Sequence, residues 1–475
     1  MKINLILLIL TSILFVGCQQ IPESQDPNII LIMCDDLGWG DTGFNGNEII
    51  QTPNLDFLAG KGITFNRFYS ASAVCSPTRG SCLTGRNPYR YGIPTANAGH
   101  MKIEEITLPE LLKERGYSTG HFGKWHLGTL TTKVKDANRG KPGDSTNYSI
   151  PTMHGYDSYF VTESKIPTYD PMWKPKMFDT DKGEGLRYGW KAVQNKNDAE
   201  KYGTHYWKGV ENAETTNMEG DNSKVVMDRV IPFIENSADN SNPFFSVIWF
   251  QTPHLPVVAN EKMMAEYSKY SHQEQIYFAT ISGMDEQVGR LWEKLEELGQ
   301  AENTMIWFCS DNGPERDTPG SSGPFRERKR SLYEGGVRVP AFCVWPNKIE
   351  ADQKTDFPAF TSDYLPTITE ILNLDYPVER PIDGVSLSKL LNGESVNREK
   401  PMGFQYGGKM SWVTQEFKLI STDKGETFEL YNLIDDPSEK ENIIEEKQEL
   451  AKRMKKELLN WIESCKKSAN GADYL

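Results

Sequence analysis

The chain has 475 residues, more than one average domain, and its 38% hydrophobic and 25% charged residues are ordinary for a globular protein. A formal net charge of −14 argues against nucleic acid as a partner, because phosphate binding needs a basic surface. The same net charge would repel an anion at long range. Because salt screens charges more than about 8 Å apart, a local cluster of cations could still attract an anionic ligand.

The opening segment has the pattern of an export signal. A basic start precedes an apolar stretch from Ile3 to Val16, and Gly17 stands directly before Cys18. This ending resembles a bacterial lipobox, which implies a signal peptide over 1–17, lipidation of Cys18 and a linker over 18–28. A plain signal peptide with an incidental cysteine is the alternative. We expect an exported bacterial lipoprotein, periplasmic or at the cell surface, whose acyl chains hold it to a membrane.

Three short apolar runs predict buried parallel strands, at 29–33, 244–250 and 304–308. They are too short for helices and too continuous for half-exposed strands. Each run ends in a polar cluster, and the clusters are Asp35-Asp36, Thr252-Pro253-His254 and Ser310-Asp311-Asn312. Ligands of such sheets bind beyond the carboxyl ends of the strands, so we expect these clusters to share one site.

Helices are predicted between the strands. Thr107 and Glu110 have the spacing of a capping box and open a helix that Gly116 ends. Apolar residues recur at spacings of three and four from Tyr277 to Gly299, which indicates an amphipathic helix. Strands that alternate with helices predict an α/β fold with a large, mostly parallel central sheet flanked by helices.

The pattern changes near residue 375, so we predict a large main domain over 29–375 and a smaller α+β subdomain over 376–475. The apolar runs at 417–420 and 428–433 indicate an antiparallel sheet, and a charged amphipathic stretch over 439–462 indicates a terminal helix.

The two acidic clusters offer hard oxygen ligands from distant parts of the chain. Asp35 and Asp36, joined by Asp311 and Asn312, suit calcium or magnesium far better than zinc. Taken singly, each pair also fits a turn or a helix cap, so the metal hypothesis requires the two strand ends to lie close together.

A lone cysteine before a proline would ordinarily be structural, or at most a thiol nucleophile. Here Cys75-Ser76-Pro77-Thr78-Arg79, continuing to Thr84-Gly85-Arg86, resembles the signature of the formylglycine-dependent type I sulfatases of the alkaline-phosphatase-like superfamily. Further motifs follow in the family's order: Gly123-Lys124-Trp125-His126, Thr252-Pro253-His254, Ser310-Asp311-Asn312-Gly313, Lys329 with Glu334-Gly335-Gly336-Val337-Arg338, and Leu430-Tyr431-Asn432-Leu433. Cys82 and Arg326-Glu327-Arg328 depart from the family pattern.

The resemblance implies that a maturation enzyme oxidises Cys75 to formylglycine (3-oxoalanine). It also implies a calcium ion, with magnesium the less suitable ion, held by residue 75 and by Asp35, Asp36, Asp311 and Asn312. One hydroxyl of the hydrated aldehyde would attack sulfur, and the other would then release sulfate.

The remaining roles also come from the resemblance. Arg79 would hold the formylglycine hydroxyl, and Lys124 and Lys329 would clamp sulfate oxygens. His126 would assist deprotonation, and His254 would give a proton to the leaving alcohol, a role that Lys329 could share.

Other residues carry weaker signals. Arg326 and Arg328 are predicted to lie near an anionic substrate, although a surface charge run balanced by Glu327 is the alternative. The aromatic residues of 159–207 fit stacking on sugar rings and packing of a long loop equally well. Packing or hydrogen-bonding roles are expected for the remaining histidines, which are His100, His121, His154, His205 and His272.

The leading hypothesis is hydrolysis of sulfate esters on sulfated poly- or oligosaccharides. Two alternatives stay open. One is hydrolysis of phosphate mono- or diesters by a relative in the same superfamily. The other is a lipoprotein that binds sulfated glycans without catalysis, with Cys75 unconverted.

Overall fold

The computed structural model describes residues 26–177, 190–193, 195–376 and 379–474. The predicted signal peptide, the lipidation at Cys18 and most of the linker lie outside these residues. Within the described ranges, no helix has both the length and the apolar character that crossing a membrane requires.

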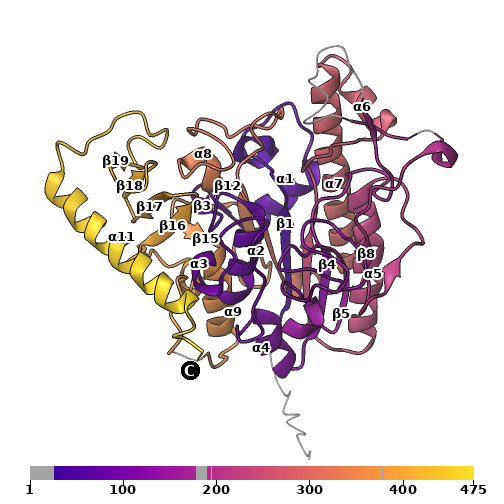
Figure 1. Cartoon of the computed structure of the whole chain (residues 1–475), viewed down its shortest axis with the longest axis horizontal. Helices are drawn as coiled ribbons and strands as arrows, with labels where there is room; N and C mark the ends of the chain where they lie inside the picture. The colour runs from indigo at the N-terminus through magenta and orange to yellow at the C-terminus, as the bar shows by residue number, and fades with distance from the viewer. Residues whose placement is uncertain (1–25, 178–189, 194, 377–378, 475) are drawn as a thin grey trace, which may run out of the picture.

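A central sheet forms the body of the molecule (Figure 1). Among the described residues, ten strands lie in the order β14-β2-β13-β11-β1-β10-β4-β5-β8-β9. The strands from β11 to β5 run parallel, and antiparallel neighbours extend both edges. The bounds are β14 Gln353–Thr355, β2 Ile63–Phe65, β13 Ala341–Val344, β11 Thr304–Ser310, β1 Asn28–Cys34, β10 Phe244–Trp249, β4 Ser118–Lys124, β5 Ser158–Thr162, β8 Tyr206–Trp207 and β9 Ala213–Glu214.

Helices cover both faces of this sheet. Alternate residues of β1 point to opposite sides, so Ile30 and Ile32 join one core while Ile29 and Leu31 join the other. The first core packs against α1 (Pro53–Gly60), α5 (Asn222–Asp239) and α7 (His272–Glu297), and the second against α2 (Cys75–Thr84), α4 (Leu108–Glu114) and α9 (Tyr364–Ile371). The predicted α/β architecture is confirmed.

A second, antiparallel sheet follows, with a long helix across it, as predicted (Figure 1, yellow). One face, which includes Trp412 and Leu419, packs against α11. The other face, which includes Phe404 and Ile420, packs against the preceding part of the chain at Leu332. The bounds are β16 Met402–Tyr406, β17 Lys409–Val413, β18 Phe417–Ser421, β19 Glu429–Asn432 and α11 Gln448–Ala469.

Short elements complete the described chain. A small sheet in the order β12-β3-β15 contributes side chains to the cores of both main sheets, and β6 pairs with β7. The bounds are β3 Phe68–Tyr69, β12 Arg338–Val339, β15 Ala359–Phe360, β6 Lys176–Met177, β7 Trp190–Lys191, α3 Pro88–Tyr91, α6 Glu261–Glu266, α8 Glu334–Val337 and α10 Ser388–Leu391.

Helix boundaries show where the sequence pattern was incomplete. The Thr107–Glu110 capping box is present and α4 follows it. Helix α7 begins at His272 rather than near Tyr277, because Ser271 caps it. Helix α11 begins only at Gln448, since Asp436 and Asn442 accept hydrogen bonds from backbone N–H groups and hold the segment before the helix in turns and irregular backbone.

The aromatic insertion contributes packing wherever it is described. Tyr206 is fully buried and its ring stacks on Phe160 at 4.2 Å, and Trp207 is 4% exposed. Trp173 is half-buried with Lys201 Nζ 3.5 Å from its ring centroid. These contacts favour the packing interpretation for Tyr206 and Trp207, while the side chain of Trp190 lies outside the described residues.

A buried ion cluster joins the two parts of the molecule and supports a stability prediction. Lys418 Nζ lies 3.0 Å from Glu334 and 2.9 Å from Glu439, and all three side chains are inaccessible to solvent. Lys418→Met would leave two buried carboxylates short of a cation, so we expect the free energy of unfolding to fall by about 3–5 kcal/mol in urea denaturation. Lys452→Met, which removes an exposed pair with Glu449, should change nothing measurable. Equal stability of the two variants would contradict the prediction.

Candidate active site

Three strand ends meet at one point of the central sheet. Because β10 and β11 flank β1 in parallel, the residues that follow these strands share one edge. Backbone hydrogen bonds join the ends: Asp35 N donates to Thr252 O at 2.9 Å, and Asp311 N donates to Cys34 O at 3.1 Å. The acidic clusters predicted from the sequence therefore lie side by side.

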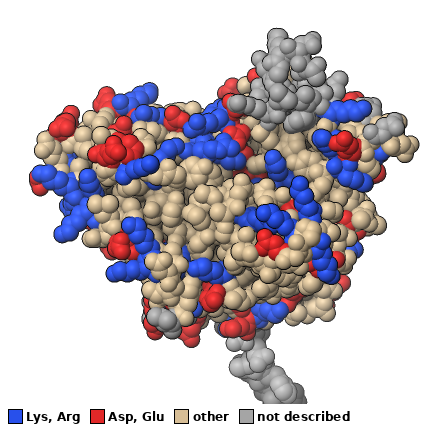
Figure 2. Space-filling model, viewed as in Figure 1, with Lys and Arg blue, Asp and Glu red and all other residues tan. Residues whose placement is uncertain are grey.

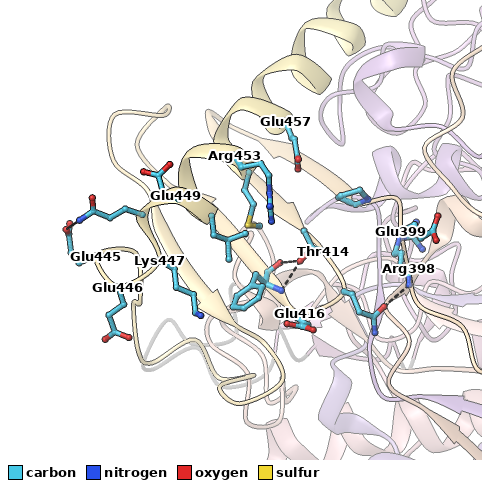
Figure 3. A pocket seen from close by; sticks show the side chains of 16 residues that line it. Arg398, Glu399, Thr414, Glu416, Glu445, Glu446, Lys447, Glu449, Arg453 and Glu457 are labelled. Carbon is cyan, nitrogen blue, oxygen red and sulfur yellow. Dashed lines mark hydrogen bonds between the residues drawn. The ribbon is translucent and has the colours of Figure 1, made fainter.

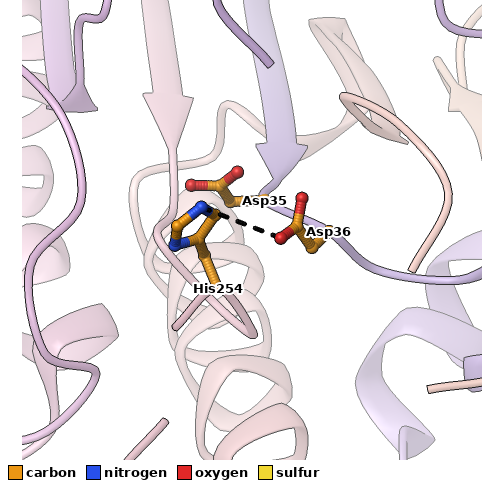
Figure 4. A group of neighbouring side chains, drawn as sticks. All are labelled: Asp35, Asp36 and His254. Atoms are coloured by element: carbon orange, nitrogen blue, oxygen red, sulfur yellow. Dashed lines mark ion pairs between the residues drawn. The ribbon is translucent and has the colours of Figure 1, made fainter. Parts of the chain in front are cut away.

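Asp36 lies at the centre of this group. Its backbone is left-handed (φ 69°), and its N–H donates to Asp311 Oδ1 at 3.2 Å. Its carboxylate accepts hydrogen bonds from Asn312 Nδ2 at 2.7 Å and from Lys329 Nζ at 2.5 and 2.7 Å. The His254 ring faces the same carboxylate, with Nε2 3.8 Å from Oδ2 (Figure 4).

Residue 75 faces the aspartates. Cys75 is the first residue of α2 and is 3% exposed, and its Sγ lies within 4.8 Å of carboxylate oxygens of Asp35 and Asp311. Arg79 follows one helical turn later, so it lies on the same face of the helix. Its Nη2 donates to Asp311 Oδ2 at 2.6 Å and lies 3.6 Å from Asp35 Oδ1.

The end of β4 brings the next two predicted residues. Lys124 Nζ donates to Asp35 Oδ2 at 2.6 Å, and both side chains are fully buried. His126 is 2% exposed and has a left-handed backbone (φ 55°). Neither of its ring nitrogens has a hydrogen-bond partner within the described structure.

The oxygen donors fit a hard cation. Asp35 Oδ1 and Asn312 Oδ1 are buried and accept no hydrogen bond from any described group, which is costly unless a ligand satisfies them. Carboxylate and amide oxygens are what calcium and magnesium prefer. An oxygen at position 75 would suit such an ion better than the cysteine sulfur does.

The crowding of charges shifts the aspartate pKa values in opposite directions. Burial raises the pKa of Asp35, but favourable electrostatic interaction with the neighbouring His254, Lys124 and Arg79 side chains outweighs burial and holds the net pKa well below its usual range. Burial, together with the charge of Asp35, raises the pKa of Asp311 to about 7. Asp35 is therefore the firmly ionised partner of the cations.

The other titratable groups follow from burial and from these neighbours. Burial raises the pKa of the Cys75 thiol, which disfavours a thiolate nucleophile. Burial lowers the pKa of His126 well below its usual value and that of His254 to about 4, so both rings are neutral. Burial alone would lower the pKa of Lys329, but Asp36 reverses the effect and raises it, so Lys329 stays charged.

The structure gives the two predicted substrate-binding arginines other partners. Arg326 donates to Tyr431 Oη at 3.1 Å and lies 3.8 Å from the centroid of the Tyr333 ring. Arg328 donates to backbone carbonyls of the 315–320 loop. Their predicted contact with substrate remains a prediction, and the contacts that they do make stabilise the loops around Lys329.

Sequence reasoning missed the contacts of Arg139, which lies against Ser76, and of its partner Glu163. Arg139 donates from Nη2 to Ser76 Oγ at 3.1 Å, and its guanidinium lies 3.5 Å from Glu163. Arg139 belongs to a loop that reads only as turns, and no sequence signal indicates its partners. Among the other histidines, His121 packs against Trp249, as expected for a packing residue.

Charges of both signs are mixed over the visible face of the molecule (Figure 2). A separate groove of about 1090 Å³ lies between α11 and the second sheet (Figure 3). Glutamates 399, 416, 445, 446, 449 and 457 line much of it, and none of the predicted site residues does.

Comparison with known proteins identifies the class. The model of the Sulfatase family matches residues 27–374, and that of the N-sulphoglucosamine sulphohydrolase C-terminal family matches residues 323–464. N-acetylgalactosamine-6-sulfatase of Mus musculus is 31% identical over 408 residues, covering 82% of this chain and 71% of its own. Steryl-sulfatase of Homo sapiens is 29% identical, covering 80% and 72%. The crystal structure of Ps i-CgsB in complex with k-i-k-neocarrahexaose has a TM-score of 0.77 at 26% identity and covers 92% and 93%.

Fold, site and relatives together define a hydrolase of the alkaline-phosphatase-like superfamily. More narrowly, the chain belongs to the sulfatase family and is a sulfuric ester hydrolase.

The unpaired oxygens support a binding prediction. After chelation, we expect the protein to take up one divalent cation and to gain about 2.7 kcal/mol of unfolding free energy at a hundred times its Kd. Asn312→Ala removes one unpaired oxygen and should raise the Kd for calcium at least about tenfold in calorimetric titration. Glu399→Gln, in the glutamate-lined groove, is the matched control and should leave the Kd unchanged. Equal Kd values for the two variants would place the cation elsewhere.

Proposed function

We propose that this sulfatase hydrolyses sulfate esters on sulfated poly- or oligosaccharides, with formylglycine made from Cys75 as its nucleophile. The observation that carries the proposal is the position of residue 75, buried at the start of α2 and facing Asp35 and Asp311. The raised pKa of its thiol speaks against cysteine itself as the nucleophile. As formylglycine, residue 75 would supply a hydrated aldehyde, with one hydroxyl for attack and a second for release.

Calcium is the ion we propose, held by Asp35, Asp36, Asp311 and Asn312 together with residue 75. When bound, such an ion supplies Lewis-acid charge for a sulfate oxygen and lowers the pKa of a nearby hydroxyl. Magnesium is less suitable because it demands a near-ideal octahedral shell and keeps several waters.

The chain's own cations bind and orient the anionic ester. Lys124 and Lys329 are buried, each within 2.6 Å of an aspartate oxygen, so their ammonium groups are fixed in place. Arg79 lies one helical turn after residue 75, is held by Asp311 and would hold the hydroxyl of the formylglycine. Fixed cations in a site closed to water stabilise developing negative charge without reorganisation.

The two histidines are neutral and serve proton transfer. Neither ring nitrogen of His126 makes a hydrogen bond within the described structure, so its unprotonated nitrogen would accept a proton from residue 75. His254 donates from Nδ1 to Leu255 O at 2.7 Å, so its Nε2 carries a lone pair. An anionic substrate beside it favours protonation of Nε2, which then gives the proton to the leaving alcohol. Lys329 has a raised pKa and is the weaker donor.

The substrate class rests on the relatives. The names of N-acetylgalactosamine-6-sulfatase and of the neocarrahexaose complex both refer to carbohydrates, whereas the name of steryl-sulfatase refers to a steryl substrate. The N-terminal pattern supports export, a lipid anchor at Cys18 and a location at a membrane, periplasmic or at the cell surface. A maturation enzyme that oxidises Cys75 is the further partner this proposal requires.

Cys75→Ala tests the nucleophile. Removing the precursor of formylglycine should lower turnover of nitrophenyl sulfate at least about 1000-fold. In the wild-type protein, co-produced with a maturation enzyme, the peptide of residue 75 should be about 18 Da lighter than its cysteine form. Cys82→Ala, in the same helix, should keep both the mass change and the activity. A wild-type protein with unmodified Cys75, or one that prefers nitrophenyl phosphate, would contradict the proposal.

Leaving-group dependence tests the division between His254 and Lys329. Sugar alkoxides need a proton, whereas nitrophenolate leaves without one. His254→Ala should therefore lower kcat/KM for a sulfated sugar by about 100- to 10,000-fold, and less for nitrophenyl sulfate. Lys329→Met, which removes a sulfate contact, should lower kcat/KM for both substrates alike. An equal loss on both substrates for His254→Ala would reject its role as proton donor.

A further inference from the structure

A buried arginine outside every sequence motif contacts the first helical turn of α2, which carries residue 75. Arg139 belongs to the loop between β4 and β5 and is only 4% exposed. Its Nη2 donates to Ser76 Oγ at 3.1 Å and to the Ala96 carbonyl at 3.1 Å. The Ser76 hydroxyl in turn donates to the backbone carbonyl of His126. Hydrogen bonds thus connect Arg139 to the residue after the nucleophile and to the histidine beside it.

The central sheet holds Arg139 in place. Glu163 directly follows β5 and is fully buried. Its carboxylate accepts hydrogen bonds from the backbone N–H of Arg139 at 2.8 Å and of Gly140 at 3.2 Å, and it also pairs with the guanidinium. A buried carboxylate and guanidinium are costly to separate, so the loop cannot easily leave the sheet.

His126 depends on this support. Its left-handed φ of 55° is unfavourable for a residue other than glycine and persists only where neighbours hold it. Within the described structure, neither ring nitrogen makes a hydrogen bond that could orient the side chain. The buried ring is therefore positioned by its backbone and by packing rather than by hydrogen bonds, and Ser76 holds the carbonyl of that backbone.

We propose that Arg139 is a positioning residue that acts through Ser76 to hold the residue-75 turn and the His126 backbone in the geometry of the reaction. This inference rests on the proposed function, since it takes residue 75 and His126 as reacting groups. Arg139 Nε has no partner among the described residues, so direct contact with substrate is the competing role.

Kinetics separate the two roles. If Arg139 acts through Ser76, Ser76→Ala and Arg139→Met should each lower kcat for nitrophenyl sulfate by about 10- to 100-fold, as misplacement of reacting groups does. KM should change less than about twofold. Because both variants break one chain of contacts, the double variant should be no slower than Arg139→Met alone. Arg139→Lys keeps a charged donor and should recover part of kcat.

Two controls separate lost positioning from altered maturation and from lost stability. Rates are expressed per chain with converted residue 75, measured by peptide mass, so that altered maturation does not count as lost catalysis. Arg398→Met breaks a buried pair with Asp363 that none of the site residues shares, and should lower the melting temperature while kcat stays unchanged. If Arg139→Met does not fold, Ser76→Ala decides, since it removes a single hydroxyl.

A rise in KM at unchanged kcat, additive losses in the double variant, or an unchanged kcat for Ser76→Ala would each overturn the proposal. A crystal structure of Ser76→Ala gives a readout that needs no activity. We expect His126 to leave the left-handed region in it, and an unchanged His126 backbone would overturn the inference. Wild-type protein inactive on sulfate esters would reject the proposed function, and this crystal structure would still decide the inference.

Discussion

The site depends on one constraint, which is that three buried carboxylates and three buried cations must neutralise each other at the end of the sheet. Such charges are tolerated in an interior only when they are paired at close range. Each cation here has an aspartate oxygen within 2.6 Å, in the pairs Arg79–Asp311, Lys124–Asp35 and Lys329–Asp36. The balance is set locally, so the net charge of −14 for the whole chain does not describe the charge at this point of the sheet.

Much of the fold could be predicted because buried parallel strands have a plain sequence pattern. The runs that became β1, β10 and β11 are continuous and apolar since both faces of the sheet are covered by helices. Less was visible where short side chains compete for the backbone. Asp436 and Asn442 delay α11 by turn hydrogen bonds that an amphipathic pattern does not register.

The candidate site could be predicted only as far as its residues follow motifs. Asp35, Cys75 and Lys329 stand in local patterns, and the structure brings them together. Arg139 has no pattern, because its importance comes from contacts with Ser76 and Glu163, which lie in two other segments. Arg326 and Arg328 show the opposite limit, since a run of cations indicates charge but not the partners that each guanidinium selects.

The Lys418 cluster bears on how this protein could be divided. Glu334 lies five residues after Lys329, and its carboxylate and backbone N–H are held by Lys418 and Glu439 from the C-terminal sheet and the segment after it. A fragment that ended before this sheet would expose Leu332 and leave Glu334 without Lys418, at the segment that presents Lys329. The C-terminal part therefore supports the segment that carries Lys329. Exchanging it between related enzymes would replace the contacts to Glu334 and Leu332 and so change the support of that segment.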